Sequence, residues 1–236
     1  MSDQNAAHHE SNRHFYDRIA NAYDLIADAN ERAARQAGVR VLALVPGEDV
    51  LELGFGTGNE VLDLAGLVGP TGKVAGIDIS SGMLAVAERK LGEAALTVPI
   101  DLRVGDARAL PFAASSFDAV YTSFTLELFS EGDIPEVLAE VKRVLRPSGR
   151  IGVVSMATVR PGQHASALER AYVWMHRHFP HIVDCRPIDT EALVAAAGFQ
   201  IATVEDLAIW TMPVRVVVGR LVSSGGEASN LQSQPS

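Results

Sequence analysis

The sequence predicts an α/β fold with a doubly wound, mainly parallel sheet, because short apolar runs alternate with helical patterns along the chain. The stretch 49–78 shows this alternation most clearly. An apolar run at 50–53 leads into three glycines at alternate positions, and a helical pattern over 61–68 leads into a second apolar run at 74–77. Strand, glycine turn, helix and strand, ending on an acid, is the layout of a nucleotide-binding βαβ unit.

The remaining elements are expected from caps, breakers and apolar runs in chain order. Ser80 or Ser81 can cap one helix, and Asp189 or Thr190 can cap another. Gly198 suits the C′ position that ends this second helix. The full set comprises helical segments over 15–37, in two pieces, and over 59–68, 81–91, 134–144, 163–179 and 191–197, and strands over 50–53, 74–77, 100–104, 117–123, 151–156, 199–207 and 210–219.

The glycine turn is the first candidate site. Gly54, Gly56 and Gly58 allow the backbone to adopt positive φ and leave room for a ligand to approach. The helix that begins near Asn59 directs unpaired backbone N–H groups toward this turn. Asp78 stands about 20 residues beyond the glycines, at the tip of the next strand, where a carboxylate can accept both hydroxyls of a ribose. We therefore expect a ligand that carries a ribose.

The spacing of the turn indicates which ribose ligand binds. Dinucleotide-binding enzymes usually carry G-x-G-x-x-G, whereas this chain reads E-L-G-F-G-T-G over 52–58. A carboxylate at Glu52 would repel a pyrophosphate and favours a ligand with an ammonium group and no phosphate. S-adenosylmethionine (SAM), with its ribose, adenine, amino acid tail and cationic sulfonium, has these properties. At this point the chain resembles the class I SAM-dependent methyltransferases, whose first motif is an acid followed by alternate glycines.

Three further stretches extend that resemblance, at 104–107, 117–124 and 141–150. The last of them is similar to the family's helix, tight turn and fifth strand. The resemblance covers roughly 15–219 and is nearest to the ubiquinone/menaquinone-biosynthesis and phospholipid N-methyltransferase-like group. It implies a Rossmann-like, doubly wound sheet of seven strands in the order 3-2-1-4-5-7-6, with the last strand antiparallel.

The resemblance also implies the cofactor site. Glu52 and Tyr23 would hold the amino acid end of SAM, Asp78 would bind the ribose, and Asp106 would face the adenine amino group. Tyr23 and Met83 have an alternative interpretation as core residues of their helices. The whole implied set is Tyr23, Glu52, Gly54, Gly56, Gly58, Asp78, Ile79, Met83, Asp106, Ala107, Thr122 and Ser123.

The acceptor side carries weaker signals. The substrate-binding residues that we expect are Tyr16, Phe124, Tyr172 and His176, and the candidate catalytic bases are Glu127, His176 and Tyr172. Tyr172 and His176 share one face of the predicted helix over 163–179, which alternatively only covers the sheet. Many relatives carry a histidine where this chain has Glu127, so a histidine base is absent there. Glu127 is interpreted as an amine-binding group, a base or a solvated helix residue.

The reaction that the resemblance implies is an in-line displacement on the methyl group of SAM, with S-adenosylhomocysteine as the product. A base is needed only where the acceptor must first lose a proton. The aromatic segment 157–189 is expected to form a substrate cap, because an insert after the fifth strand is where this family varies its acceptor pocket. We therefore expect an amphipathic or aromatic small-molecule acceptor.

Composition limits the remaining possibilities. The 236 residues, 47% of them apolar, suffice for one domain over 13–222, with disordered polar tails at 1–12 and 223–236. A net charge of −9 argues against a nucleic-acid partner. A single cysteine excludes intramolecular disulfides and cysteine-based zinc sites, and we expect no metal. No signal peptide or transmembrane run is evident, so a cytoplasmic location is expected.

Two other functions remain open on these residues. A non-catalytic SAM-binding or scaffold protein would share every cofactor motif. An NAD-dependent oxidoreductase would share the βαβ unit and Asp78, but Glu52 and the glycine spacing disfavour it.

Overall fold

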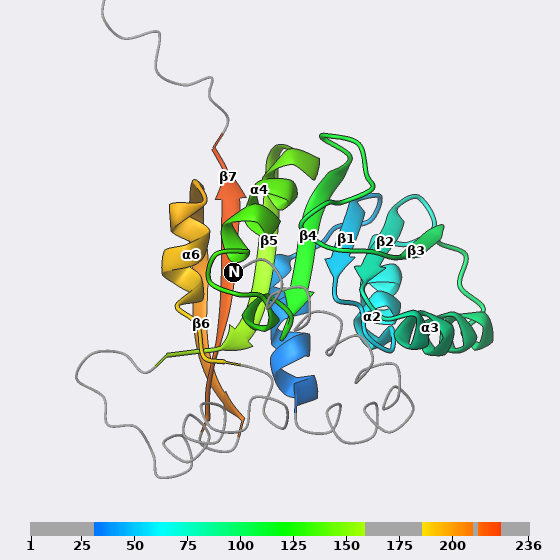
Figure 1. The fold of residues 1–236 in the computed structure, drawn as a ribbon. Helices are drawn as coiled ribbons and strands as arrows, with labels where there is room; N and C mark the ends of the chain where they lie inside the picture. The colour runs from blue at the N-terminus through cyan, green and yellow to red at the C-terminus, as the bar shows by residue number, and fades with distance from the viewer. Residues whose placement is uncertain (1–30, 159–185, 210–211, 223–236) are drawn as a thin grey trace, which may run out of the picture.

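A seven-stranded sheet runs through the computed structural model, which describes residues 31–158, 186–209 and 212–222 (Figure 1). Its strands lie in the order β3-β2-β1-β4-β5-β7-β6. Only β7 runs antiparallel to its neighbours, β5 and β6. The predicted strand order and the antiparallel last strand are therefore confirmed. The strands are β1 (Asp49–Leu53), β2 (Lys73–Asp78), β3 (Ile100–Val104), β4 (Phe117–Ser123), β5 (Leu145–Met156), β6 (Phe199–Ile209) and β7 (Met212–Leu221).

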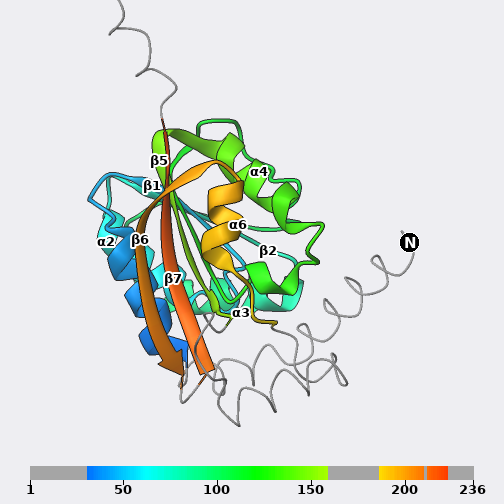
Figure 2. The ribbon, with the colours of Figure 1, turned by 90° about the vertical axis from the view of Figure 1, so that its left-hand side faces the viewer.

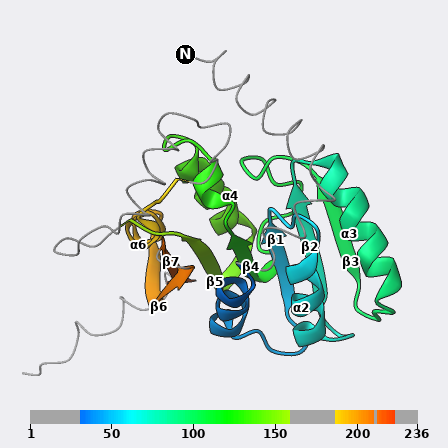
Figure 3. The same ribbon diagram turned by 90° about the horizontal axis from the view of Figure 1, so that it is seen from below.

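Helices cover both faces of the sheet and bury two apolar cores (Figures 2 and 3). A helix over residues 31–42 packs with α2 (Asn59–Val68) and α3 (Ser81–Glu93) against one face. On the opposite face lie α4 (Ile134–Val144) and α6 (Thr190–Ala196). Central strands are buried on both sides, which explains their nearly continuous apolar runs. None of the helices in the described residues is long and apolar enough to cross a membrane.

The helix ends follow the expected capping chemistry. The Ser80 hydroxyl accepts a hydrogen bond from the backbone N–H of Met83 at 3.1 Å. Asp189 accepts one from Ala192 at 3.2 Å. Gly198 has a φ of 87° just beyond α6, a conformation that costs glycine little. Of the two caps considered for each helix, the structure selects the earlier residue.

The start of β5 differs from the prediction. A tight turn was expected before a strand beginning at residue 151, but the extended backbone starts at Leu145, which pairs with Phe117. The backbone N–H of Ser116 donates to the Val144 carbonyl, so pairing begins directly after α4. The expected turn is present as an irregularity within this longer strand. The pairing of β4 with β5 shifts register between Phe117 and Ala119, and Ser148 has a φ of 67°.

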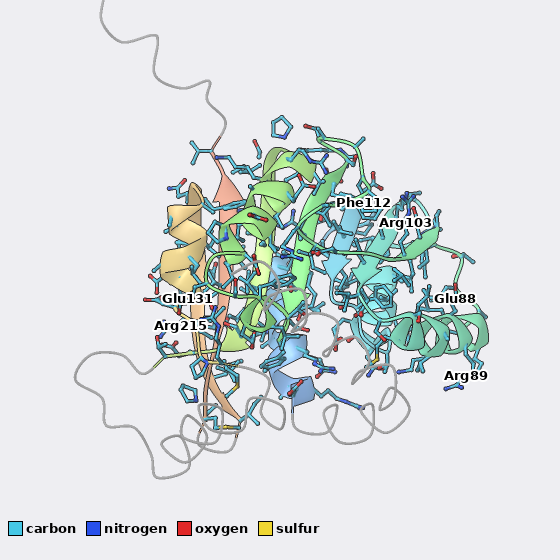
Figure 4. All side chains as sticks on the ribbon, in the orientation of Figure 1. Glu88, Arg89, Arg103, Phe112, Glu131 and Arg215 are labelled. Carbon is cyan, nitrogen blue, oxygen red and sulfur yellow. The ribbon has the colours of Figure 1, made fainter. Side chains whose placement is uncertain are left out.

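Arginines tie the loop between β3 and β4 to its surroundings. Arg143 of α4 donates to the carbonyls of Leu110 and Phe112 at 2.9 and 2.8 Å. On β3, the guanidinium of Arg103 lies over the Phe112 ring, 4.8 Å from its centre (Figure 4). These contacts hold the part of the loop around residues 110–112.

Candidate functional site

The three glycines after β1 all adopt left-handed backbone conformations, but they serve different purposes. Their φ values are 69° at Gly54, 52° at Gly56 and 80° at Gly58. A Cβ on Gly54 would collide with the side chain of Thr125, so glycine lets the loop after β4 pack against the turn. A Cβ on Gly56 would meet no atom of the described residues within 4 Å. Gly56 is therefore the position where the turn faces open space.

Asp78 is held against this turn at the end of β2. One carboxylate oxygen accepts the backbone N–H of Gly56 and the other accepts that of Ser80, both at 2.9 Å. A carboxylate oxygen can accept more than one hydrogen bond, so a ligand hydroxyl could add to these contacts. Its assignment to a ribose stays a prediction, and the structure adds that Asp78 also shapes the glycine turn.

Asp106, in the loop after β3, already has a charged partner that sequence reasoning missed. The Arg108 guanidinium donates to its carboxylate at 2.7 to 3.2 Å. Arg108 also lies 3.3 Å from Asp133, just before α4. Ala107, between Asp106 and Arg108 in the sequence, is buried. A ligand amino group at Asp106 must share the carboxylate with Arg108.

Glu52 is the most unusual charged group in the described residues. Its side chain is fully buried in β1, and neither carboxylate oxygen has a hydrogen-bond partner among those residues. Burial, reinforced by the nearby Glu60 carboxylate, raises the pKa of Glu52 well above 4.5, against the opposing effect of Arg35. Buried polar atoms normally find partners. The bare carboxyl therefore suits a ligand that brings hydrogen-bond donors and positive charge.

Arg35, from the helix over residues 31–42, lies beside this carboxyl and was not predicted. Its guanidinium donates to Glu31 at 2.6 Å and lies 3.5 Å from Glu60 and 5.9 Å from the centre of the Phe124 ring. The Tyr121 hydroxyl donates to its backbone carbonyl at 2.9 Å. Glu31 and Arg35 were visible as a pair four residues apart. The packing of their helix beside β1 was not.

The end of β4 supplies the wall next to the glycine turn. Thr122, Ser123 and Phe124 are all buried. Phe124 has a φ of 49°, which turns the chain sharply after the strand. The Thr125 hydroxyl donates to the Ser123 carbonyl at 2.9 Å and packs against Gly54. The residues predicted at the cofactor's reactive end thus lie beside the turn.

Glu127 is buried in the short 3-10 helix η1 (Leu126–Leu128) that follows this wall. One carboxyl oxygen accepts the Met156 backbone N–H at 3.0 Å, and the other has no partner among the described residues. Burial raises the pKa of Glu127 to about 8. Its interpretation as a solvated helix residue is therefore wrong, because only 1% of the residue is exposed.

The remaining predicted residues divide into two groups. Ile79 is half-buried and Met83 is 2% exposed, so Met83 fits its core interpretation as well as a cofactor contact. Four others lie outside the described residues: Tyr16, Tyr23, Tyr172 and His176.

The chain is similar in sequence to known methyltransferases. A family described as "Methyltransferase domain" matches residues 50–149. Demethylmenaquinone methyltransferase of Lactobacillus johnsonii is 36% identical over 143 residues, which cover 59% of this chain and 58% of that protein. The chain therefore spans less than two thirds of that relative. Nocamycin O-methyltransferase of Saccharothrix syringae is 32% identical over 231 residues, which cover 89% of this chain and 80% of that protein.

Solved structures share the fold at lower identity. A SAM dependent methyltransferase from Aquifex aeolicus aligns with a TM-score of 0.60 and 20% identity, covering 81% of this chain and 93% of that one. The [4+2]-cyclase SpnF aligns with a TM-score of 0.64 and 20% identity, covering 80% of both chains. Because one of these proteins is a cyclase, the shared fold alone does not identify a reaction.

Proposed function

Because the chain belongs to the class I SAM-dependent methyltransferases, we propose that it transfers the methyl group of SAM to a small-molecule acceptor by in-line displacement. The match to nocamycin O-methyltransferase over most of both chains carries the family assignment. The site observation that carries the reaction is Glu52, a buried carboxyl without a partner in the described residues, next to a turn that is open at Gly56.

These residues fit SAM as the cofactor. A Cβ at Gly56 would enter the space left beside the turn, and the bare oxygens of Glu52 suit an ammonium group. In this proposal Glu52 holds the amino acid end, Asp78 the ribose and Asp106 the adenine amino group. The bound cofactor supplies a methyl carbon already activated by the sulfonium.

The protein's task is then mainly positioning. The acceptor atom must be held about 3 Å from the methyl carbon, in line with the bond that breaks. Thr122, Ser123 and Phe124 form the wall next to the turn and exclude water from that side. Tyr16, Tyr172 and His176 stay predictions for the acceptor side.

Among the candidate catalytic bases, Glu127 is the one that lies in the described residues, and it could accept a proton from the acceptor. Its Oε1 is anchored by the Met156 N–H, which leaves Oε2 to accept a proton or a hydrogen bond. A carboxyl whose pKa lies at about 8 is mainly protonated at neutral pH and becomes available as a general base as the pH rises toward 8. A hydroxyl acceptor would need such a group, whereas an acceptor with a free lone pair would not.

A small-molecule acceptor is supported by the relatives and by charge. Demethylmenaquinone and nocamycin give two of the relatives their names. The net charge of −9 opposes binding to nucleic acid. Among small molecules, the aromatic residues of segment 157–189 favour an amphipathic or aromatic acceptor.

A transfer experiment tests the proposal against the non-catalytic alternative. The full chain is incubated with methyl-labelled SAM and a metabolite extract, and label is followed by mass spectrometry. We expect one extract component to gain label with the native protein and with Gly69→Val, but not with Gly56→Val. Tight SAM binding without label in any component would favour a scaffold.

A further inference from the structure

Glu52 lies where no side chain among the described residues offers a full countercharge. Its nearest cation in the described residues is Arg35, which already binds Glu31 at 2.6 Å and lies 3.5 Å from Glu60. Both carboxyl oxygens are shielded from water and without a partner in those residues. An ionised carboxylate in such a place is costly, whereas a neutral carboxyl is much less so.

The groups around Glu52 add to this imbalance. One of them is a cation, Arg35, from the helix over residues 31–42. The other four are acidic or neutral: Glu60 and Asp63 of α2, Asp78 of β2 and Tyr121 of β4. Burial is the largest cause that raises the pKa of Glu52, and the carboxylates of α2 and β2 act in the same direction.

We propose that Glu52 is neutral in the cofactor-free protein and releases its proton to solvent when the ammonium group of SAM binds beside it. The O–H bond of the carboxyl breaks, the proton leaves to solvent, and the carboxylate accepts a hydrogen bond from an N–H of the ammonium group. The ligand supplies the positive charge that the described residues do not fully provide, so ionisation and binding occur together. This rests on the proposed function, because it takes the amino acid end of SAM as the partner of Glu52.

The sign of the pH dependence follows from proton release. The complex holds fewer protons than the free protein, so affinity rises with pH, by up to about tenfold per pH unit below the free-state pKa of Glu52. The rise ends where the ligand's own α-amino group loses its proton, at about pH 7.7–8.0. Ligands without an ammonium group should show neither proton release nor this rise.

Calorimetry on the full chain at about pH 6.5, where the ligand α-amino group stays charged, tests the proposal. Titrations are run in two buffers with different ionisation enthalpies, which gives the number of protons released. SAM and S-adenosylhomocysteine should release the same fraction, up to about one proton. Methylthioadenosine, which keeps the nucleoside but lacks the ammonium, should release none. This ligand therefore controls for protons that come from Asp78 or Asp106.

Two variants assign the proton to its residue. Glu52→Gln should bind SAM without releasing a proton, whereas Glu88→Gln, an exposed change on α3, should match the native protein (Figure 4). SAM binding without proton release by the native protein would overturn the inference and leave the proposed function intact. Equal release by Glu52→Gln would do the same. Failure of SAM to bind the native protein would overturn both. The native titrations decide the matter if Glu52→Gln fails to fold.

Discussion

The acidic side chains at the two ends of the parallel strands differ in whether other side chains of the protein pair with them. At the amino end, Arg150 donates to both oxygens of Glu48 at 2.7 Å, and Arg146 pairs with Asp49 and Asp118. At the carboxyl end, both oxygens of Glu52 and one of Glu127 have no partner in the described residues. One end is completed by folding, and the other retains unmet hydrogen-bonding capacity that a ligand can satisfy.

The pKa shifts of these acids follow the same division. Burial alone would raise the pKa of Glu48, but hydrogen bonds from Arg150 and from the Val45 backbone bring it below 4.5. At the other end burial prevails and raises the pKa of both Glu52 and Glu127. The difference shows that burial marks a candidate site only where the protein omits the countercharge.

The largest expected effect concerns Glu127 and stability. Between about pH 4.5 and 8 the unfolded chain has released this proton while the folded chain still holds it, so stability falls as pH rises. Glu127→Gln removes the effect, which is on the order of 5 kcal/mol across this range. Denaturant unfolding from pH 5 to pH 9 should therefore show a shallower decline in the variant.

The exposed Glu131 provides the matched control, since Glu131→Gln makes the same chemical change nearby (Figure 4). Its pH profile should follow that of the native protein. Parallel profiles for native and Glu127→Gln proteins would mean that Glu127 does not hold a proton in the folded state.

The next effect compares two glycines with positive φ. Gly56 and Gly69 have φ values of 52° and 64°, and an added Cβ meets nothing within 4 Å at either among the described residues. Valine should cost stability at both, and Gly69, with a ψ of −172°, has a conformation that is essentially restricted to glycine. Only Gly56→Val should weaken SAM binding, by at least about 100-fold, or roughly 2.7 kcal/mol. Equal SAM affinities for the two variants would place the cofactor elsewhere.

The smallest effect separates two aspartates that each accept a backbone N–H. Asp78 accepts that of Gly56 at the carboxyl end, and Asp118 accepts that of Asp49 at the amino end. Asp78→Ala should weaken SAM binding by roughly 1–3 kcal/mol through lost hydrogen bonds. Asp118→Ala should lower the unfolding midpoint and leave SAM affinity unchanged. An unaltered SAM affinity in Asp78→Ala would show that the ribose assignment is wrong.

Local sequence signals were enough for much of the fold. The bounds of β3, β4 and α4 were predicted to the residue, because apolar runs and breakers delimit them. The start of β5 was not, since it depends on Leu145 pairing with Phe117 across the sheet. Periodicity carries no information about such long-range register.

The candidate site was predictable from the sequence only where a residue type in a given pattern points to few structural roles. Alternate glycines and an acid at the end of a strand indicated the turn and Asp78. Arg35 and Arg108 were missed because their roles come from tertiary packing beside Glu52 and Asp106. The buried position of Glu127 and the hydrogen bond that its Oε1 accepts from Met156 likewise depend on packing against another strand.

Calorimetric titration of the full chain with SAM and, separately, with NAD tests most directly that the carboxyl end is built for a cationic nucleoside without phosphate. SAM should bind with a saturable heat, and NAD should give none, because a pyrophosphate brings no ammonium group to the buried oxygens of Glu52, which have no partner among the described residues. Binding of NAD without binding of SAM would contradict the account.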